Sequence, residues 1–294
     1  MRGVARGNLD QIMSMNGNES AVRVARARRP SMSDQDVSDL LAFFAESLKT
    51  ILGDQLFGLY LTGSLTYGDF DRGSSDIDFL AVLNQVLSGE NLNRVKRVHA
   101  HIASSYPVWA KRIEGSYVTK EMLGSMHPPG TPRPYINEGR FWDPDPLYGN
   151  EWLINLYALY QCGVSLVGPD PKVFIGPIDI SDVREASKRD LLEEWQPKLR
   201  DQFFFANSHY QTYAILTMCR ILHRARNNGL ASKRMAATWV KRAYGKPWSD
   251  LIERAERWQH GREMNAKEET ADFIKFTLDQ IVAGTSQQSS DQNR

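Results

Sequence analysis

Apolar side chains recur along this chain in two rhythms, one typical of helices and one typical of strands. Helical spacing begins after Ser33-Asp34-Gln35-Asp36, a Ser-x-x-Asp sequence that resembles a capping box, and continues through 37–44. Two short apolar runs follow, and such runs predict buried strands. The expected elements after the first helix are strands at 56–61 and 77–83, a helix at 91–105 and a strand at 112–118.

Prolines interrupt the pattern between His127 and Pro146, where six of them occur. That density removes backbone donors and predicts a long surface loop, a kind of segment that is often functional. After it, the spacing predicts a helix at 152–160 and a strand at 164–167. From Ser181 onward only helices are expected, at 183–200, 203–227, 232–243, 248–259 and 266–282.

The order of these elements predicts two domains. Residues 33–175 should form an α/β domain with a small mixed sheet, and residues 180–283 an all-α helical bundle. Both ends should be disordered, because 1–32 contain six arginines and few apolar residues, and 284–294 are polar and of low complexity. A transit peptide is the alternative explanation of the first segment.

The composition is that of a globular protein of 294 residues, 41% of them hydrophobic and 24% charged. No apolar run approaches the roughly 20 residues that cross a bilayer, which argues against a membrane-spanning protein. Lys and Arg total 36 against 35 Asp and Glu, and this balance argues against nucleic acid as a partner. Cys162 and Cys219 have no metal-binding or redox spacing, so we expect core thiols in a protein of the reducing cytoplasm.

The segment between the first two expected strands contains the most informative chemistry. Gly63-Ser64 follows a strand, and a helix beginning at Leu65 would point its free N–H groups at an anion such as phosphate. Asp76 and Asp78 flank Ile77 on the next strand, so both carboxylates should face one way while Ile77 faces the core. Two carboxylates beside a phosphate cradle suit Mg²⁺, whereas two solvent-exposed acids after a turn are the alternative.

Gly-Ser followed, after a spacer, by Asp-x-Asp resembles the signature of polymerase-β-type nucleotidyltransferases. More closely, the chain resembles the bacterial aminoglycoside adenylyltransferases that modify streptomycin and spectinomycin. The similarity covers about 55–283, and the first of its segments is the most specific. Four segments match in order: 59–82, Arg112-Ile113-Glu114, Leu166-Val167-Gly168-Pro169 and 213–239.

The resemblance implies a role for eight residues. Asp76 and Asp78 would hold Mg²⁺, and Glu114 on the third strand would act as the catalytic base. Alternation along that strand supports the last role, because Glu114 should face opposite to a core residue. The remaining five would bind the phosphates of ATP: Gly63, Ser64, Ser75, Arg220 and Lys233.

Simpler alternatives exist for several of these residues. Glu114 is otherwise an ordinary exposed acid on a strand. Arg220 lies in an almost wholly apolar segment and needs an anionic partner, which is either a phosphate or an Asp or Glu in an internal salt bridge. The aromatic residues of the helical half are expected mostly in the core, although some rings could stack on adenine or a sugar: 203–205, Trp195, Tyr210, Tyr213, Trp239, Trp248 and Trp258.

The function implied by the resemblance is transfer of AMP from ATP to a hydroxyl of a small, cationic, aminoglycoside-like acceptor, with release of pyrophosphate. The enzyme would be a monomer, and the acceptor would lie in the cleft between the two domains. Adenylylation of a protein, an RNA or an unknown metabolite is the alternative reaction. A nucleotide-binding relic is the non-enzymatic alternative, but it would have lost one of the three carboxylates, and all three are present.

The acceptor site is less well defined by the sequence. In streptomycin modifiers a tryptophan of the loop region, here Trp142 or Trp152, and an acid near the interdomain segment contact the drug. The position of that acid falls at Ala206-Asn207, which carry no charge and so argue against streptomycin as the acceptor. Four other acids would either supply counter-charges to a cationic drug or simply solvate the loop: Glu138, Asp143, Asp145 and Glu151.

Overall fold

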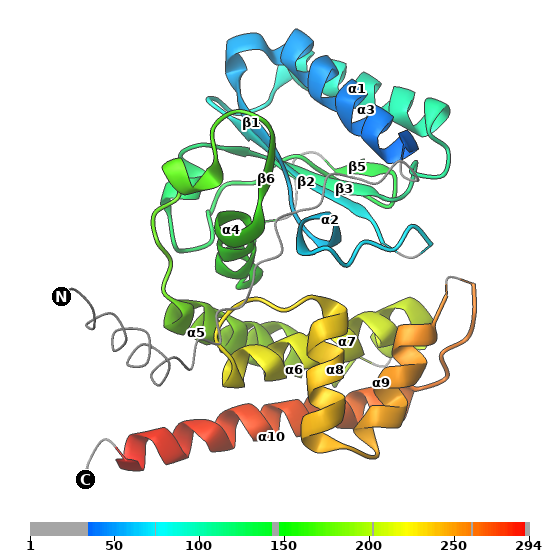
Figure 1. Cartoon of the computed structure of the whole chain (residues 1–294), viewed down its shortest axis with the longest axis vertical. Coiled ribbons are helices and arrows are strands. Elements are labelled where there is room, and N and C mark those ends of the chain that lie inside the picture. The colour runs from blue at the N-terminus through cyan, green and yellow to red at the C-terminus, as the bar shows by residue number, and fades with distance from the viewer. Residues whose placement is uncertain (1–34, 74, 143–146, 202, 260, 292–294) are drawn as a thin grey trace, which may run out of the picture.

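The computed structural model describes residues 35–291 except 74, 143–146, 202 and 260. Its first half is built on a six-stranded sheet in the order β5-β4-β3-β2-β1-β6 (Figure 1). β2 and β3 are parallel and the other neighbouring pairs are antiparallel, so the sheet is mixed, as predicted. The strands are β1 (Leu56–Leu61), β2 (Ile77–Leu83), β3 (Ile113–Thr119), β4 (Tyr135–Asn137), β5 (Arg140–Trp142) and β6 (Val164–Val167).

Two helices, α1 (Gln35–Leu52) and α3 (Gly89–Ser105), cover one face of the sheet (Figure 1). The helical spacing of apolar residues at the start of α1 produces this contact, because it places them on one side of the helix. Phe44 of α1 and Ile77 of β2 are both fully buried in the resulting core. This face therefore fixes which side chains of β2 and β3 point away from it.

The opposite face is covered by α4 (Glu151–Cys162), and beside it lies α2 (Ser64–Tyr67), a single helical turn. Apolar side chains from β1, β2 and β3 pack here against α4. The same cluster includes residues of α5 (Ile180–Asp190), the first helix after the sheet. The sheet and the helical half are thus joined by one continuous apolar contact.

The helical half is centred on α7 (Ser208–Arg226), which packs against α8, α9 and α10. α10 is the long helix at the bottom of Figure 1. The other elements here are a π-helical turn (Leu191–Trp195), α6 (Gln196–Lys198), α8 (Lys233–Tyr244), α9 (Trp248–Arg257) and α10 (Lys267–Asp291). Single 3-10 turns occur at Gly53–Gln55, Met122–Gly124, Pro171–Val173 and Phe204–Ala206.

The proline-rich segment is not wholly irregular, so the prediction of a structureless loop over 127–146 is wrong in part. β4 and β5 form a hairpin within it, and the residues of its two-residue turn, Glu138 and Gly139, both have positive φ. The hairpin survives because Pro134 precedes β4, so no proline interrupts its ladder. Residues 143–146 lie outside the described part of the chain.

Three other elements differ most from their predicted bounds, and the rest agree to within about two residues at each end. The helix expected at 183–200 is divided by the π-helical turn, and the one expected at 203–227 begins at Ser208, where Asn207 caps it through its side chain. The tail expected to be disordered differs most, because α10 continues to Asp291. A helix that is already nucleated gains one hydrogen bond per added residue, so a Gln- and Ser-rich sequence can extend it. The extension 1–32 lies outside the described residues.

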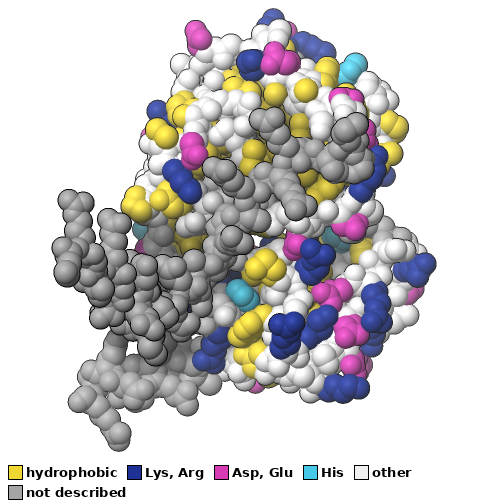
Figure 2. Space-filling model, in the orientation of Figure 1, with side chains coloured by type: hydrophobic (Ala, Val, Ile, Leu, Met, Phe, Trp, Pro, Cys, Tyr) yellow, Lys and Arg dark blue, Asp and Glu magenta, His cyan; other side chains and the backbone are white. Residues whose placement is uncertain are grey.

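Among the helices that the structure describes, none combines the length and hydrophobicity that crossing a bilayer requires. On the face shown in Figure 2, basic and acidic side chains are interspersed over the helical half. This mixture matches the near-zero net charge of the sequence. Cys219 is buried, as predicted, and Cys162 is half-buried.

His99 makes the stability of the first half dependent on pH. Its ring is buried against Phe44 and Phe79, with Nε2 2.6 Å from the Tyr117 hydroxyl. Burial lowers the pKa of His99 to about 3, below the value near 6.5 of an unfolded chain. Folding therefore favours the neutral ring, and this contribution is lost as the pH falls from about 6.5 towards 3.

We expect His99→Gln to remove this dependence, at roughly 1.4 kcal/mol per pH unit. Urea unfolding of both proteins between pH 7 and pH 4 measures it. The difference in unfolding free energy between wild type and variant should shrink or change sign as the pH falls. A difference that stays constant over this range would show that His99 does not titrate between the folded and unfolded states.

Candidate active site

The parallel pairing of β2 and β3 brings the predicted carboxylates together. In this register Asp78 lies beside Glu114, and Ile77 lies beside Ile113. Both isoleucines are buried in the core under α1 and α3, at no more than 1% exposure. Because side chains alternate along a strand, Asp78 and Glu114 both point to the opposite face. Asp76, two residues before Asp78, directly precedes β2 and is at the same end of the sheet.

The turn after β1 packs directly against one of these carboxylates. Gly63 has a φ of +64°, and a Cβ atom at this position would lie 1.9 Å from an oxygen of Asp78. A backbone hydrogen bond from Ser64 stabilises the ionised form of Asp78. The hydroxyl of Ser64 is buried and has no hydrogen-bond partner among the residues that the structure describes. Gly63 therefore allows the turn to approach Asp78 closely, and Ser64 leaves its hydroxyl available to a ligand.

Burial and mutual repulsion disfavour the simultaneous ionisation of these carboxylates. Burial and the charge of Asp76 raise the pKa of Asp78 to about 7. Burial, followed by the charges of Asp76 and Asp78, raises the pKa of Glu114 to about 8. Lys233 acts in the opposite direction on both groups. The arrangement is one that positive charge would stabilise.

Arg112 supports Asp76, a role that the sequence analysis did not identify. Its Nε lies 3.5 Å from a carboxylate oxygen of Asp76, and its guanidinium stacks on Trp109 with 4.6 Å to the ring centroid. Arg112 also donates hydrogen bonds to the backbone carbonyls of Arg72 and Ser75. It therefore holds both the carboxylate and the loop that delivers it to β2. The sequence contained a hint of this role, because Arg112 directly precedes Ile113, the core residue before Glu114.

Ser75, predicted to contact the triphosphate, has a clear role within its own loop. Its hydroxyl oxygen accepts a hydrogen bond of 2.9 Å from the backbone N–H of Asp71, and its own N–H donates to the Asp71 carbonyl at 2.7 Å. These contacts shape the turn before Asp76. Binding of phosphate by Ser75 stays a prediction.

Two cations from the helical half complete the cluster. Arg220 of α7 is half-buried, and within the described part of the chain its only hydrogen bond is a long one of 3.4 Å to the Thr217 hydroxyl. Its Nε is buried without a partner, so the internal salt bridge considered from the sequence does not form among these residues. The charge of Arg220 nevertheless lowers the pKa of Asp78, which places it near the carboxylates.

Lys233, the first residue of α8, borders the same cluster. Its side chain is in part open to solvent, but the surrounding protein and the charge of Arg220 lower its pKa. Asp78, Asp76 and Glu114 act in the opposite direction, so the ammonium group is close to all three carboxylates. The structure thus gathers acids from the sheet and cations from the helical half at one junction.

Comparison with known proteins identifies both halves. Residues 44–123 match the family model described as nucleotidyltransferase domain, and residues 173–283 match the one described as aminoglycoside adenylyltransferase, C-terminal domain. Spectinomycin 9-adenylyltransferase of Staphylococcus aureus, in strains Mu50 and N315, is 25% identical over 224 residues, which is 73% of this chain and 82% of the relative. The two halves of the chain are thus similar, in order, to a nucleotidyltransferase domain and to the C-terminal domain of aminoglycoside adenylyltransferases.

The fold of this chain is shared by a solved structure. A crystal structure of spectinomycin adenyltransferase from Enterococcus faecialis with ATP and spectinomycin matches it with a TM-score of 0.62 at 20% identity. The match covers 83% of this chain and 98% of the other. The predicted fold class and the prediction of a nucleotidyltransferase are therefore confirmed, whereas the roles of individual residues stay predictions.

The residues of this site fit the divalent cation that the sequence implied. The described residues contain no group of three or more His, Cys, Asp or Glu side chains that could hold a metal ion. Mg²⁺ does not require one, because it is typically bound by one or two carboxylates, with waters and substrate phosphates as the other ligands. The mutual repulsion of Asp76 and Asp78 and the unpartnered hydroxyl of Ser64 agree with such a site.

A pocket of about 650 Å³ opens between the two halves of the chain. Glu138 of the β4–β5 turn contributes from the sheet, and its charge raises the pKa of Glu114, so the pocket adjoins the carboxylate cluster. Ala206 and Asn207 line the pocket too, and they occupy the position where streptomycin modifiers have a drug-contacting acid. The remaining lining residues are Phe203, 208–210, Trp258 and 261–263. A second hollow, between α1 and α3, lies on the far side of the sheet.

Trp152 and Glu151, which the sequence also suggested as acceptor contacts, make other contacts in the structure. Trp152 is 2% exposed, and its indole N–H donates to the Ser125 carbonyl at 2.9 Å, so it is a core residue. Glu151 accepts a hydrogen bond of 3.0 Å from the Gly149 N–H in a local turn. Asp143 and Asp145 lie outside the described residues, as does the side chain of Trp142. Of the two acids that the structure describes, Glu138 lines the pocket and Glu151 does not.

Proposed function

We propose that the protein transfers AMP from ATP to a hydroxyl of a small cationic acceptor of the aminoglycoside or aminocyclitol class. One observation carries the proposal: three carboxylates of the sheet and two cations of the helical half converge beside a pocket between them. Spectinomycin is the acceptor named for the Staphylococcus aureus relatives, and it is the first candidate here.

In the proposed reaction the acceptor hydroxyl oxygen attacks the α-phosphorus of ATP. A bond forms from that oxygen to phosphorus, the bond from phosphorus to the bridging oxygen breaks, and pyrophosphate leaves. Glu114 accepts the hydroxyl proton, a contribution of typically 10²–10⁴-fold for a well-placed base. When bound by Asp76 and Asp78, Mg²⁺ supplies Lewis-acid stabilisation of phosphoryl oxygens. The Ser64 hydroxyl and the backbone of Gly63 approach the phosphates.

Arg220 and Lys233 are assigned to the leaving group. Pyrophosphate gains negative charge as it departs, and fixed cations at that position lower the barrier because they require no reorganisation. The unpartnered Nε of Arg220 supports the assignment, since an arginine held without a protein carboxylate has capacity for an anionic ligand. Ser75 belongs to this group through the resemblance alone.

The acceptor is assigned to the pocket between the halves. Its aromatic rings, Tyr210 and Trp258 among them, provide flat apolar surface for sugar or aminocyclitol rings. Glu138 and Glu263 both line the pocket, one from the sheet and one from the helical half, and both carry the charge that an ammonium group favours. Glu138 is also held at a φ of +50°, which is uncommon for a residue other than glycine, asparagine or aspartate.

We expect Glu138→Asn to stabilise the fold and weaken acceptor binding. Asparagine suits the first position of this two-residue turn, so relief of backbone strain should raise the unfolding free energy by up to about 1 kcal/mol. Loss of the charge should raise the KM for the acceptor roughly tenfold and leave the KM for ATP unchanged. Thermal unfolding and steady-state kinetics measure the two effects. A variant with unchanged acceptor KM would remove Glu138 from the acceptor site.

The function is tested by pyrophosphate release from Mg²⁺-ATP across a panel of aminocyclitols, aminoglycosides and lincosamides. Spectinomycin should give release, and mass spectrometry should find the drug heavier by one AMP. Release without a modified drug would point to ATP hydrolysis. ATP binding without transfer to any member of the panel would overturn the proposed acceptor class and favour a metabolite or a macromolecule.

A further inference from the structure

Asp69 links the two halves of the chain at the carboxylate cluster. It follows α2, and its side chain is only 14% exposed. Its carboxylate accepts a hydrogen bond from the hydroxyl of Ser232 and lies 2.6 Å from Nη2 of Arg234, both at the start of α8. These residues are more than 160 positions apart in the sequence. The contact therefore joins the loop after the Gly-Ser turn to the helix that begins with Lys233.

Both ends of this contact are fixed within their own halves. On the sheet side, the backbone N–H of Asp69 donates to the carbonyl of Ser64 at 3.2 Å. On the helical side, Ser232 is the N-cap of α8, and its hydroxyl oxygen accepts a hydrogen bond from the Met235 N–H at 3.1 Å. One hydroxyl thus receives the cap bond of the helix and donates to Asp69. Ser232 is 5% exposed, so water has little access to either bond.

The chain of contacts runs from Ser64 through Asp69 and Ser232 to Lys233. Lys233 directly follows the N-cap, so the position of its Cα is set by the same contact. A lysine side chain has four rotatable bonds and is strongly hydrated, so it reaches a defined point only if its backbone is held. The negative charge of Asp69 is also favourable at the positive end of the α8 dipole.

We propose that Asp69 is a positioning residue of the reaction, which holds Lys233 in place against the phosphates of ATP. The proposal rests on the proposed function, because that function assigns Lys233 to the phosphates. Asp69 itself touches neither the carboxylates nor the nucleotide in this scheme. It acts through the start of α8 and keeps the phosphate-binding groups of the two halves in register. Most of the effect belongs to the buried bond with Ser232, because Arg234 is 72% exposed.

A double-mutant cycle on nucleotide affinity tests the proposal. The probe is the Mg²⁺ complex of α,β-methylene ATP, which cannot be cleaved at the α-phosphorus. Calorimetry measures its dissociation constant from wild type, Asp69→Ala, Lys233→Ala and the double variant. We expect each single variant to bind about tenfold more weakly. The double variant should bind within about twofold of Lys233→Ala, because Asp69 acts through that residue. Losses that multiply to about a hundredfold would overturn the proposal, as would an Asp69→Ala variant with wild-type affinity.

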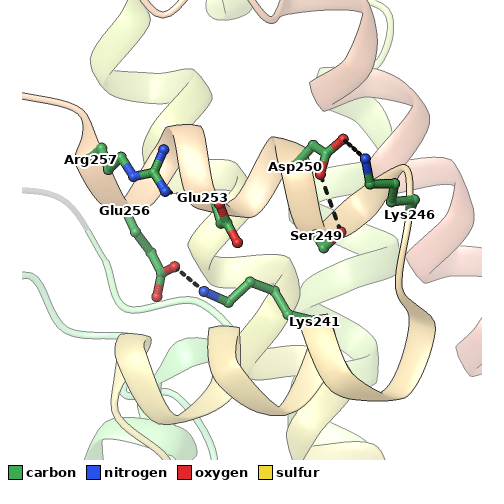
Figure 3. Close-up of polar contacts among 7 residues, drawn as sticks. All are labelled: Lys241, Lys246, Ser249, Asp250, Glu253, Glu256 and Arg257. Atoms are coloured by element: carbon green, nitrogen blue, oxygen red, sulfur yellow. Dashed lines mark hydrogen bonds and ion pairs between the residues drawn. The ribbon is translucent and has the colours of Figure 1, made fainter.

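A matched control is available at the other end of the same helix. Lys241 of α8 forms an ion pair of 2.6 Å with Glu256 of α9, within the helical half and with both side chains about one quarter exposed (Figure 3). Glu256→Ala should lower the melting temperature by an amount similar to Asp69→Ala and leave nucleotide affinity unchanged. Equal losses of affinity in the two variants would show a merely structural effect.

The two proposals fail in different ways. Wild-type protein that binds the nucleotide but transfers AMP to no acceptor would overturn the proposed function, while the cycle would still decide the role of Asp69. Wild-type protein that transfers AMP but shows multiplicative losses in the cycle would overturn only the role of Asp69. Protein that binds no nucleotide would overturn both.

Discussion

Asp78→Asn is expected to reduce AMP transfer roughly a thousandfold or more. Asp78 lies beside Glu114 and touches the Gly63 turn, so it is the carboxylate placed most centrally in the cluster. Replacement by an amide removes one of two acidic ligands proposed for Mg²⁺. Several kcal/mol of transition-state stabilisation are then lost, and each 1.36 kcal/mol corresponds to a factor of ten in rate. Pyrophosphate release at saturating ATP and acceptor measures the effect.

The same substitution is expected to stabilise the metal-free protein. The folded-state pKa of Asp78, about 7, is above the unfolded value of 3.8, so the folded state disfavours the charged carboxylate. The resulting cost grows as the pH rises from about 4 to 7 and is fully present above 7. At pH 8 the variant should therefore unfold at a higher temperature than wild type, a trade between stability and activity.

Two comparisons separate this explanation from damage to the fold. Added Mg²⁺ should raise the melting temperature of the wild type and leave that of Asp78→Asn unchanged. Asp250→Asn, at an exposed residue of α9 that pairs with Lys246 (Figure 3), should keep wild-type activity. Wild-type turnover by Asp78→Asn would contradict the metal assignment, and a lower melting temperature would contradict the electrostatic argument.

The geometry of the carboxylates was predictable because it depends on local alternation. Ile77 and Ile113 are both buried, and a period of two then sends Asp78 and Glu114 to the other face whatever the rest of the chain does. The order of strands and helices along the chain also follows from local periodicity. What alternation does not contain is the parallel pairing of β2 with β3, which places the two acids side by side.

Contacts between distant segments could not be predicted in this way. Asp69 and Ser232 are polar residues of ordinary appearance in a turn and at a helix start, and nothing local pairs them. Arg112 likewise acquires its role from a loop that lies about 40 residues earlier. The hairpin is not predicted for another reason: the six prolines of this segment indicate an irregular loop, although Glu138-Gly139 forms a turn.

Arg220 shows how far composition alone could go. Its place among apolar residues implied an anionic partner, either a phosphate, which the resemblance favours, or an internal carboxylate. The structure gives it no ion pair within the described residues and leaves Nε without a partner. The sequence alone does not reveal that the salt bridge is absent, because a phosphate ligand and an internal carboxylate are compatible with the same position of Arg220 on α7.

Glu114→Gln is expected to slow AMP transfer by 10²–10⁴-fold while Mg²⁺-ATP still binds. Glutamine keeps the size and position of the side chain beside Asp78 but accepts no proton. The binding groups assigned to ATP lie on other residues, so the dissociation constant for the nucleotide should change by less than about twofold. Equal losses of binding and transfer would refute the assignment of Glu114 as the base.

The pH dependence of the rate gives this variant a second, independent signature. A base works when deprotonated, and burial with the neighbouring carboxylates raises the pKa of Glu114 to about 8 in the protein without ligands. Transfer by the wild type should therefore rise with pH along a limb whose midpoint lies at or below about 8, because any bound cation lowers this pKa. In Glu114→Gln that limb should be absent, since the group that titrates is gone. A limb of unchanged midpoint in the variant would assign the proton transfer to a different residue.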